Sequence, residues 1–92
     1  MMCLVFWDKK IIDGVYRKLS SRNILYTQLY LPDQIWSIVL EFSNPPIEQG
    51  YECIADEVYF LADTAPHYLL ADGFKFDFLD GPRKIGECIV TT

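Results

Sequence analysis

The stretch that decides the fold, Phe74–Val90, reads FKFDFLDGPRKIGECIV. Every second residue from Phe74 to Phe78 is phenylalanine, Gly81-Pro82 follows, and a second alternating run leaves that pair. Residues two apart share one face of a β-strand, and a Gly-Pro pair between two such runs is typical of a tight turn. The stretch therefore predicts an antiparallel hairpin. The alternation places Ile85, Glu87 and Ile89 on one face of its second strand and Gly86, Cys88 and Val90 on the other.

The rest of the chain follows the same period of two. Strands are expected at Met2–Trp7, Asn23–Leu31 and Ile35–Phe42, and Asn44-Pro45-Pro46 ends the last of these because neither proline can donate to a sheet. Within Ile35–Phe42 the side chains expected on one face are Trp36, Ile38, Leu40 and Phe42.

The longest run, Tyr51–Ala62, breaks the alternation, because Ile54, Val58 and Phe60 share parity with acidic residues. A β-bulge near Ala55–Glu57 would move the later residues to the other face. The only helix candidate, Asp13–Ser21, is short and peripheral. Period and turn spacing thus predict one all-β domain over residues 1–92 with little or no helix.

Composition favours a folded chain and limits its partners. Of the 92 residues 51% are hydrophobic and 23% charged, far from the composition of disordered chains. The net charge of −5 repels a phosphate backbone, which argues against general nucleic-acid binding. An acidic surface fits ordinary solubility, and it also fits docking on a basic partner.

The cysteines and the N-terminal segment indicate a cytoplasmic protein. Cys3, Cys53 and Cys88 are odd in number and form no CxxC motif, so we expect neither disulfides nor zinc but small buried residues in a reducing compartment. Met1–Trp7 is apolar but far shorter than a membrane helix, and basic residues follow it rather than precede it as in a signal peptide.

The hairpin also carries a family resemblance. Asp72–Val90, DGFKFDFLDGPRKIGECIV, resembles the last hairpin of the C-terminal domain of bacterial elongation factor Tu. Earlier parts of that domain are resembled more weakly by Gln28–Leu31, Ile35–Phe42 and Pro45–Gly50. The resemblance implies a closed, six-stranded antiparallel barrel with Greek-key connections. The residues of the hairpin that match the family are Asp72, Gly73, Phe76, Gly81, Arg83, Gly86 and Val90.

The departures from that family concern function. No GxxxxGK[ST] phosphate loop is present, so GTP binding is not implied. In the family the hairpin turn touches the backbone of tRNA, and here Asp80-Gly81 occupy that place. However, Leu79 replaces the preceding basic residue and Pro82 replaces the second turn glycine. The resemblance therefore implies a fold more strongly than an activity.

No catalytic, metal-binding or cofactor-binding constellation is predicted. His67 is the single histidine, and Asp63 is its only local candidate partner, so a loop histidine without a catalytic role is the simpler interpretation. The adjacent Asp56-Glu57 pair would point to opposite faces of a strand and would not converge on one ion.

These observations predict a non-enzymatic cytoplasmic module that binds a protein. The residues expected to contact the partner are Asp80, Gly81, Arg83 and His67. Two alternatives stay open: a small acidic immunity or inhibitor protein that masks a basic toxin or nuclease, and residual binding of tRNA through the hairpin turn. The partner and the oligomeric state do not follow from the sequence.

Overall fold

The structure is a computed structural model that describes residues 1–9 and 17–92. Over these residues the fold is all-β, with one short helix, α1 (Pro46–Gln49), and one 3-10 turn, η2 (His67–Leu69). The strands are β1 (Met2–Trp7), β2 (Ile24–Tyr30), β3 (Ile35–Glu41), β4 (Glu52–Ala55), β5 (Glu57–Phe60), β6 (Lys75–Asp80) and β7 (Arg83–Thr91).

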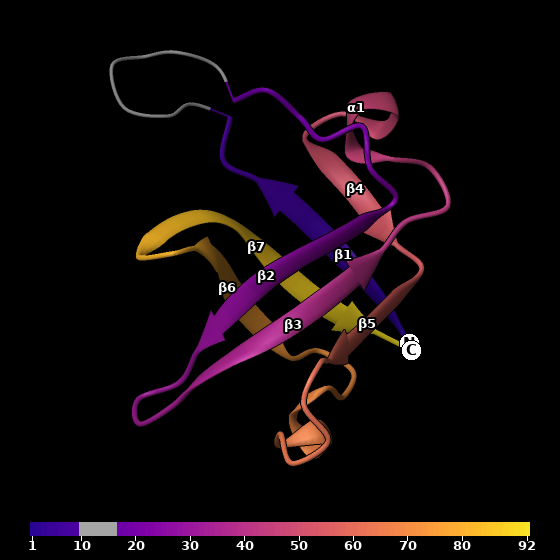
Figure 1. Cartoon of the computed structure of the whole chain (residues 1–92). Coiled ribbons are helices and arrows are strands. Elements are labelled where there is room, and N and C mark those ends of the chain that lie inside the picture. The colour runs from indigo at the N-terminus through magenta and orange to yellow at the C-terminus, as the bar shows by residue number, and fades with distance from the viewer. Residues whose placement is uncertain (10–16) are drawn as a thin grey trace.

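The seven strands form one sheet in the order β4-β1-β7-β6-β2-β3-β5, and all neighbouring pairs are antiparallel (Figure 1). The expected closed, six-stranded barrel is therefore wrong in strand number and in closure, because β4 and β5 are edge strands. The sheet curls until β5 approaches the start of β1, where the N–H of Val58 donates to the C=O of Met1 at 3.1 Å. Within the described residues, β1 and β5 are not paired in register.

The seventh strand arises where the run Tyr51–Ala62 divides at Asp56. Cys53 and Ala55 are buried before the break, and Val58 and Phe60 are buried after it, so the inward face changes parity there. This confirms the predicted slip near Ala55–Glu57, although the result is two strands rather than one bulged strand. The first pairs with β1 and the second with β3, on opposite edges of the sheet.

The hairpin of β6 and β7 has the predicted two-residue turn. Gly81 has a φ of +62°, and Pro82 cannot adopt the positive φ that a type I′ turn needs at its second central residue, so the turn is of type II′. The register shifts between Phe78 and Leu79, which makes Ile85 an extra residue on β7. Ile85 and Gly86 are consequently both buried, so the predicted grouping of Ile85 with Glu87 on one face is wrong.

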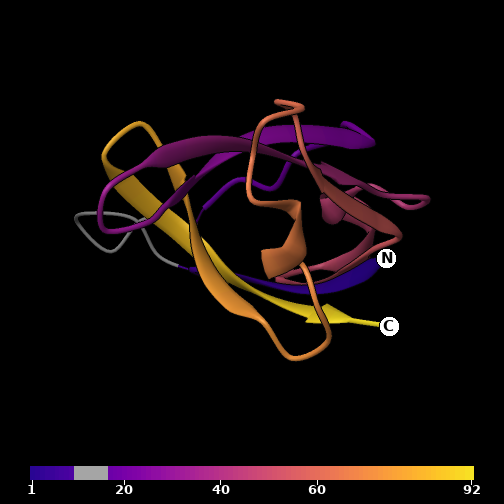
Figure 2. The ribbon, with the colours of Figure 1, turned by 90° about the horizontal axis from the view of Figure 1, so that it is seen from below.

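The core lies inside the curl. Figure 2 shows β2 and β3 on one side, β1 and β7 on the other, and the segment between β5 and β6 across the opening. Ala65 and Leu70 of that segment belong to the core cluster. The three cysteines are buried and free, as predicted. The expected inward face of β3 is also confirmed, with Trp36 half-buried and Ile38, Leu40 and Phe42 buried.

The helix candidate Asp13–Ser21 lies partly outside the described residues, and residues 17–21 form no helix. In the described part of the chain no helix is long and apolar enough to cross a membrane.

Candidate functional site

A cleft opens where β2 and β6 part. These strands pair at only two positions, Gln28 with Leu79 and Leu29 with Phe78, although both strands continue beyond them. The next positions, Tyr30 and Asp77, are not in register as a pair. β6 stays paired with β7 along this stretch, so the separation falls entirely on the side of β2.

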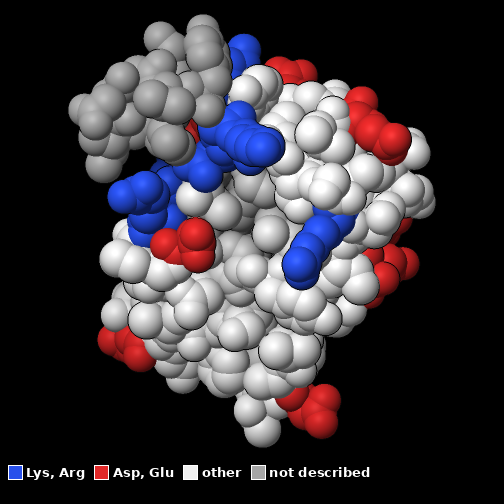
Figure 3. Space-filling model, turned by 45° about the horizontal axis from the view of Figure 1, so that its top comes forward, with Lys and Arg blue, Asp and Glu red and all other residues white. Residues whose placement is uncertain are grey.

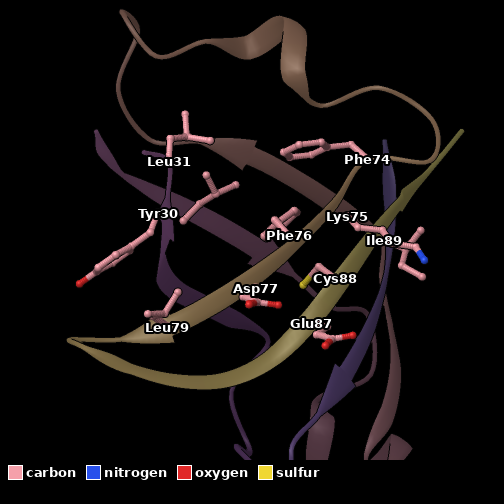
Figure 4. Close-up of a pocket in the computed structure, with 11 residues that line it drawn as sticks. Tyr30, Leu31, Phe74, Lys75, Phe76, Asp77, Leu79, Glu87, Cys88 and Ile89 are labelled. Atoms are coloured by element: carbon pink, nitrogen blue, oxygen red, sulfur yellow. The ribbon is translucent and has the colours of Figure 1, made fainter. Parts of the chain in front are cut away.

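The cleft has a volume of about 550 Å³, and Figure 4 shows its walls, with β2 on one side and β6 and β7 on the other. Apolar groups predominate in the lining, and charged side chains of the outer faces of β6 and β7 stand at its rim. The lining residues are Leu29, Tyr30, Leu31, Phe74, Lys75, Phe76, Asp77, Leu79, Glu87, Cys88 and Ile89.

The two carboxylates at the rim are held by one lysine. Asp77 and Glu87 are direct cross-strand partners, an arrangement of like charges that destabilises a sheet. Lys84 Nζ lies 3.0 Å from Glu87 Oε1 and 3.7 Å from Asp77 Oδ1. The hydrogen bond to Glu87 raises the pKa of the Lys84 ammonium above its ordinary value. Lys75 also lines the cleft, so two cations accompany the two carboxylates and the rim is close to neutral. The lining therefore favours apolar groups rather than a charge.

The edge of β6 offers backbone hydrogen-bonding groups to the cleft. The C=O of Phe74 accepts from the N–H of Val90, so Phe74 points its carbonyl toward β7. Backbone groups of successive strand residues point to alternate sides, so the N–H and C=O of Lys75 point away from β7 and toward β2. Among the described residues β2 has no partner in register with Lys75. The cleft thus combines apolar walls with an unpaired strand edge.

The predicted contact residues of the turn lie just beyond one end of the cleft. The Thr27 hydroxyl donates to the C=O of Leu79, and the Tyr30 hydroxyl donates to the C=O of Gly81 at 2.9 Å. Both bonds fasten the end of the hairpin to β2. Asp80, Gly81 and Arg83 are exposed there.

His67 is not brought together with the turn. It lies in η2, on the connection that precedes β6, whereas Asp80 ends that strand and Gly81 and Arg83 follow it. Its ring meets Phe60 edge to face, with centroids 5.8 Å apart, and Nε2 is 3.0 Å from the C=O of Asp63. The contact is to the backbone of Asp63 rather than to its carboxylate, so the two residues form no acid–base pair. The geometry assigns His67 to packing of the connection.

Basic residues gather near the hairpin end of the molecule. The N–H of Asp8 donates to the C=O of Ile85 at 3.0 Å, and the C=O of Asp8 accepts from Arg17 Nε at 3.1 Å. These bonds bring Lys9 and Arg17 beside the end of the hairpin that holds Arg83. In Figure 3 most of the Lys and Arg side chains in view lie in one half of the surface, and carboxylates lie mainly around its periphery.

The thiol in the cleft lining is unreactive. Cys88 lines it, but burial raises the pKa of the Cys88 thiol far above its ordinary value, so the thiol stays protonated and is a poor nucleophile. Among the described residues no three His, Cys, Asp or Glu side chains cluster as a metal site would require. The arrangement is suited to holding an extended, mainly apolar segment.

Sequence reasoning missed the cleft because its walls come from distant parts of the chain. Leu29 and Leu31 belong to β2, and Phe74 and Leu79 to the final hairpin. Each run has an ordinary strand pattern, and nothing in either run indicates that the ladder between them ends after two pairs.

No family model, curated protein or solved structure matches the chain.

Proposed function

We propose that this protein is a non-enzymatic binding module that holds an extended segment of a partner protein in the cleft between β2 and β6. The observation that carries the proposal is the early end of the β2–β6 ladder, which leaves an apolar cleft beside the backbone groups of Lys75. The resemblance to the elongation factor Tu domain, and a place in the cytoplasm, stay predictions beside it.

An extended peptide satisfies both features of the cleft. Adding a strand to an open edge supplies main-chain hydrogen bonds, while alternate side chains of the added strand enter apolar pockets. Leu31, Phe74 and Leu79 would receive such side chains, because they line the cleft and are only half-buried. Asp80, Gly81 and Arg83 would contact the same partner where it leaves the cleft.

The test is selection of a displayed library of seven-residue random peptides against the folded chain, followed by amide hydrogen exchange with a selected peptide bound. The Lys75 amide should exchange quickly in the free chain and more slowly in the complex. Leu31→Trp, which fills the cleft, should remove binding, whereas Ile47→Trp on α1, at a residue 53% exposed and outside the lining, should not. Thermal melts of both variants check that they fold.

Peptides that bind the folded Leu31→Trp variant as well as the parent chain would refute the cleft as the site. Unchanged exchange of Lys75 on saturation would refute the added strand.

The basic hairpin end supports a second candidate function, binding of RNA by Asp80, Gly81 and Arg83 together with Lys9 and Arg17. The proximity of these basic residues favours it, and the net charge of −5 opposes it. Filter binding to tRNA across a salt series decides the matter, since no affinity even at low salt would end this candidate.

The immunity or inhibitor hypothesis names a kind of protein partner rather than a different mode of binding. It predicts that reversing several surface carboxylates abolishes protection against a basic toxin.

A further inference from the structure

A second surface lies on the outer face of β2, β3 and β5, which are adjacent strands in the sheet (Figure 1). Its centre is Val39, which is 0% exposed although it does not belong to the inner core cluster. Val39 is paired in register with Tyr26 on one side and Tyr59 on the other. Because cross-strand partners lie side by side on one face, the two tyrosine side chains cover Val39 from outside.

The aromatic cover is held in place but remains open to solvent. The Tyr59 hydroxyl donates to the carboxylate of Glu41, and this hydrogen bond raises the pKa of Tyr59 above its ordinary value. Tyr26 is 68% exposed and Tyr59 is 39% exposed. Ile24 precedes Tyr26 along β2. Leu61, whose N–H donates to the C=O of Ser37, follows β5 and extends the patch at its far side. We call Ile24, Tyr26, Val39, Tyr59 and Leu61 the tyrosine face.

Single exposed apolar residues are ordinary on a protein surface, whereas a contiguous patch of them marks an interaction site. The tyrosine face is contiguous across three strands, because register pairs and backbone hydrogen bonds place its residues on neighbouring strands side by side.

Carboxylates border one end of the tyrosine face. Glu41 and Glu57 are direct partners across β3 and β5, and Asp56 immediately precedes Glu57. Like charges placed directly opposite cost stability, so a nearby cation would be favourable there. In the described part of the chain no Lys or Arg forms an ion pair with these three carboxylates, and Glu57 is contacted by the Met1 ammonium at 2.9 Å.

We propose that the tyrosine face binds an arginine- or lysine-bearing segment of a partner protein. Charge complementarity selects this occupant, since the open aromatic rings and the carboxylates both attract cations and both repel a phosphate backbone. A guanidinium stacks its flat face on an exposed tyrosine ring. The N–H groups in the plane of the guanidinium then donate hydrogen bonds to a neighbouring carboxylate. This site is separate from the cleft, whose lining includes none of these residues.

The test uses a capped peptide of alternating glycine and arginine and the same peptide with citrulline, which keeps the shape of arginine without its charge. Binding is followed at low salt by chemical shift changes of the backbone amides of the full chain. The arginine peptide should saturate, shift the amides of β2, β3 and β5, and weaken as salt is added. The citrulline peptide should bind at least about tenfold more weakly.

Four variants sharpen the experiment. Tyr26→Leu keeps an apolar side chain and removes the ring, so it should weaken the arginine peptide about two- to five-fold, whereas Tyr26→Phe should retain binding. The double variant Glu41→Gln and Glu57→Gln should lose most of the affinity. Tyr68→Leu is the matched control, because Tyr68 is 81% exposed but lies in η2, and it should bind as the parent chain does.

The proposal is overturned if no saturable binding occurs at low salt, if citrulline replaces arginine without loss, or if Tyr26→Leu and Tyr68→Leu behave alike. It is also overturned if the shifted amides lie at the cleft. Leu31→Trp should leave arginine binding unchanged, so failure here and failure of the cleft proposal are distinguishable.

Discussion

The rings of Trp7 and Phe78 meet edge to face over Gly86, with their centroids 5.1 Å apart and their planes at 86°. Gly86 is the register partner of both residues, of Trp7 on β1 and of Phe78 on β6. A Cβ at Gly86 would clash with the Phe78 ring and the backbone C=O of Phe6. Because Gly86 has no side chain, the two aromatic rings can pack against each other above it.

Adding a methyl group at this point should destabilise the fold. We expect Gly86→Ala to lower the free energy of unfolding by about 1–3 kcal/mol, and Gly86→Val by more, because the clash involves backbone as well as a ring. Urea denaturation followed by tryptophan fluorescence measures the effect. Glu87→Ala, at the exposed neighbouring position, serves as control, and equal midpoints for the two alanine variants would contradict this role of Gly86.

The outer edge of β4 depends on one side-chain amide. Gln49 Oε1 accepts from the N–H of Ile54 at 2.8 Å, and Gln49 Nε2 donates to the C=O of the same residue at 3.1 Å. The amide thereby takes the place of a further strand on an otherwise open edge. Gln49→Glu cannot donate to that carbonyl, so we expect a loss of about 1 kcal/mol and more self-association, measured by denaturation and by sedimentation. Glu48→Gln, next to it and exposed, should change neither quantity.

Asp56 should make stability fall in acid. Hydrogen bonding by Ser43, from its side chain and from its N–H at 2.6 Å, lowers the pKa of the Asp56 carboxyl below its ordinary value. A group whose pKa is depressed on folding contributes stability above its unfolded pKa, near 4, and that contribution is lost as the pH falls through the folded pKa. Asp56→Asn should therefore reduce the difference in unfolding midpoint between pH about 6 and pH about 3. An unchanged difference would exclude Asp56 as a contributor.

The pKa of Tyr59 should lie above the ordinary value of a tyrosine. Its hydrogen bond to Glu41 is the main cause of its raised pKa. A pKa raised on folding contributes stability that is complete below the unfolded pKa and is lost as the pH rises through the folded value. Glu41→Gln should bring the pKa of Tyr59 down toward about 10. Carbon-13 labelling of the tyrosine rings resolves the individual titrations, and an identical Tyr59 curve in the variant would exclude this bond.

Much of the secondary structure was predictable because its causes are local. The strand β1 has the predicted bounds, Met2–Trp7, and β2 differs from its predicted range by one residue at each end. The turn at Gly81-Pro82 follows from the conformations these two residues prefer. The parity slip near Asp56 was also visible, since acidic and apolar residues cannot share a buried face.

The candidate sites were predictable only in part, because they depend on relations between strands. Asp80, Gly81 and Arg83 do lie at an exposed turn beside the cleft, but His67 lies at the other end of β6. The tyrosine face could be found only from the strand register, which places Tyr26 and Tyr59 on either side of Val39. That register joins residues separated by long stretches of chain, and alternation within each strand is the same whatever the partner.

The sequence by itself determined that this chain forms short antiparallel strands around an apolar interior, because the period of two and the turn residues act over a few neighbouring positions. Only the tertiary structure decided that the sheet has seven strands and two edges, that the β2–β6 ladder stops after two pairs, and that tyrosines cover an outward valine. The physical reason is that strand order and register are chosen by packing between distant segments, here around the crossing of Trp7 and Phe78 over Gly86.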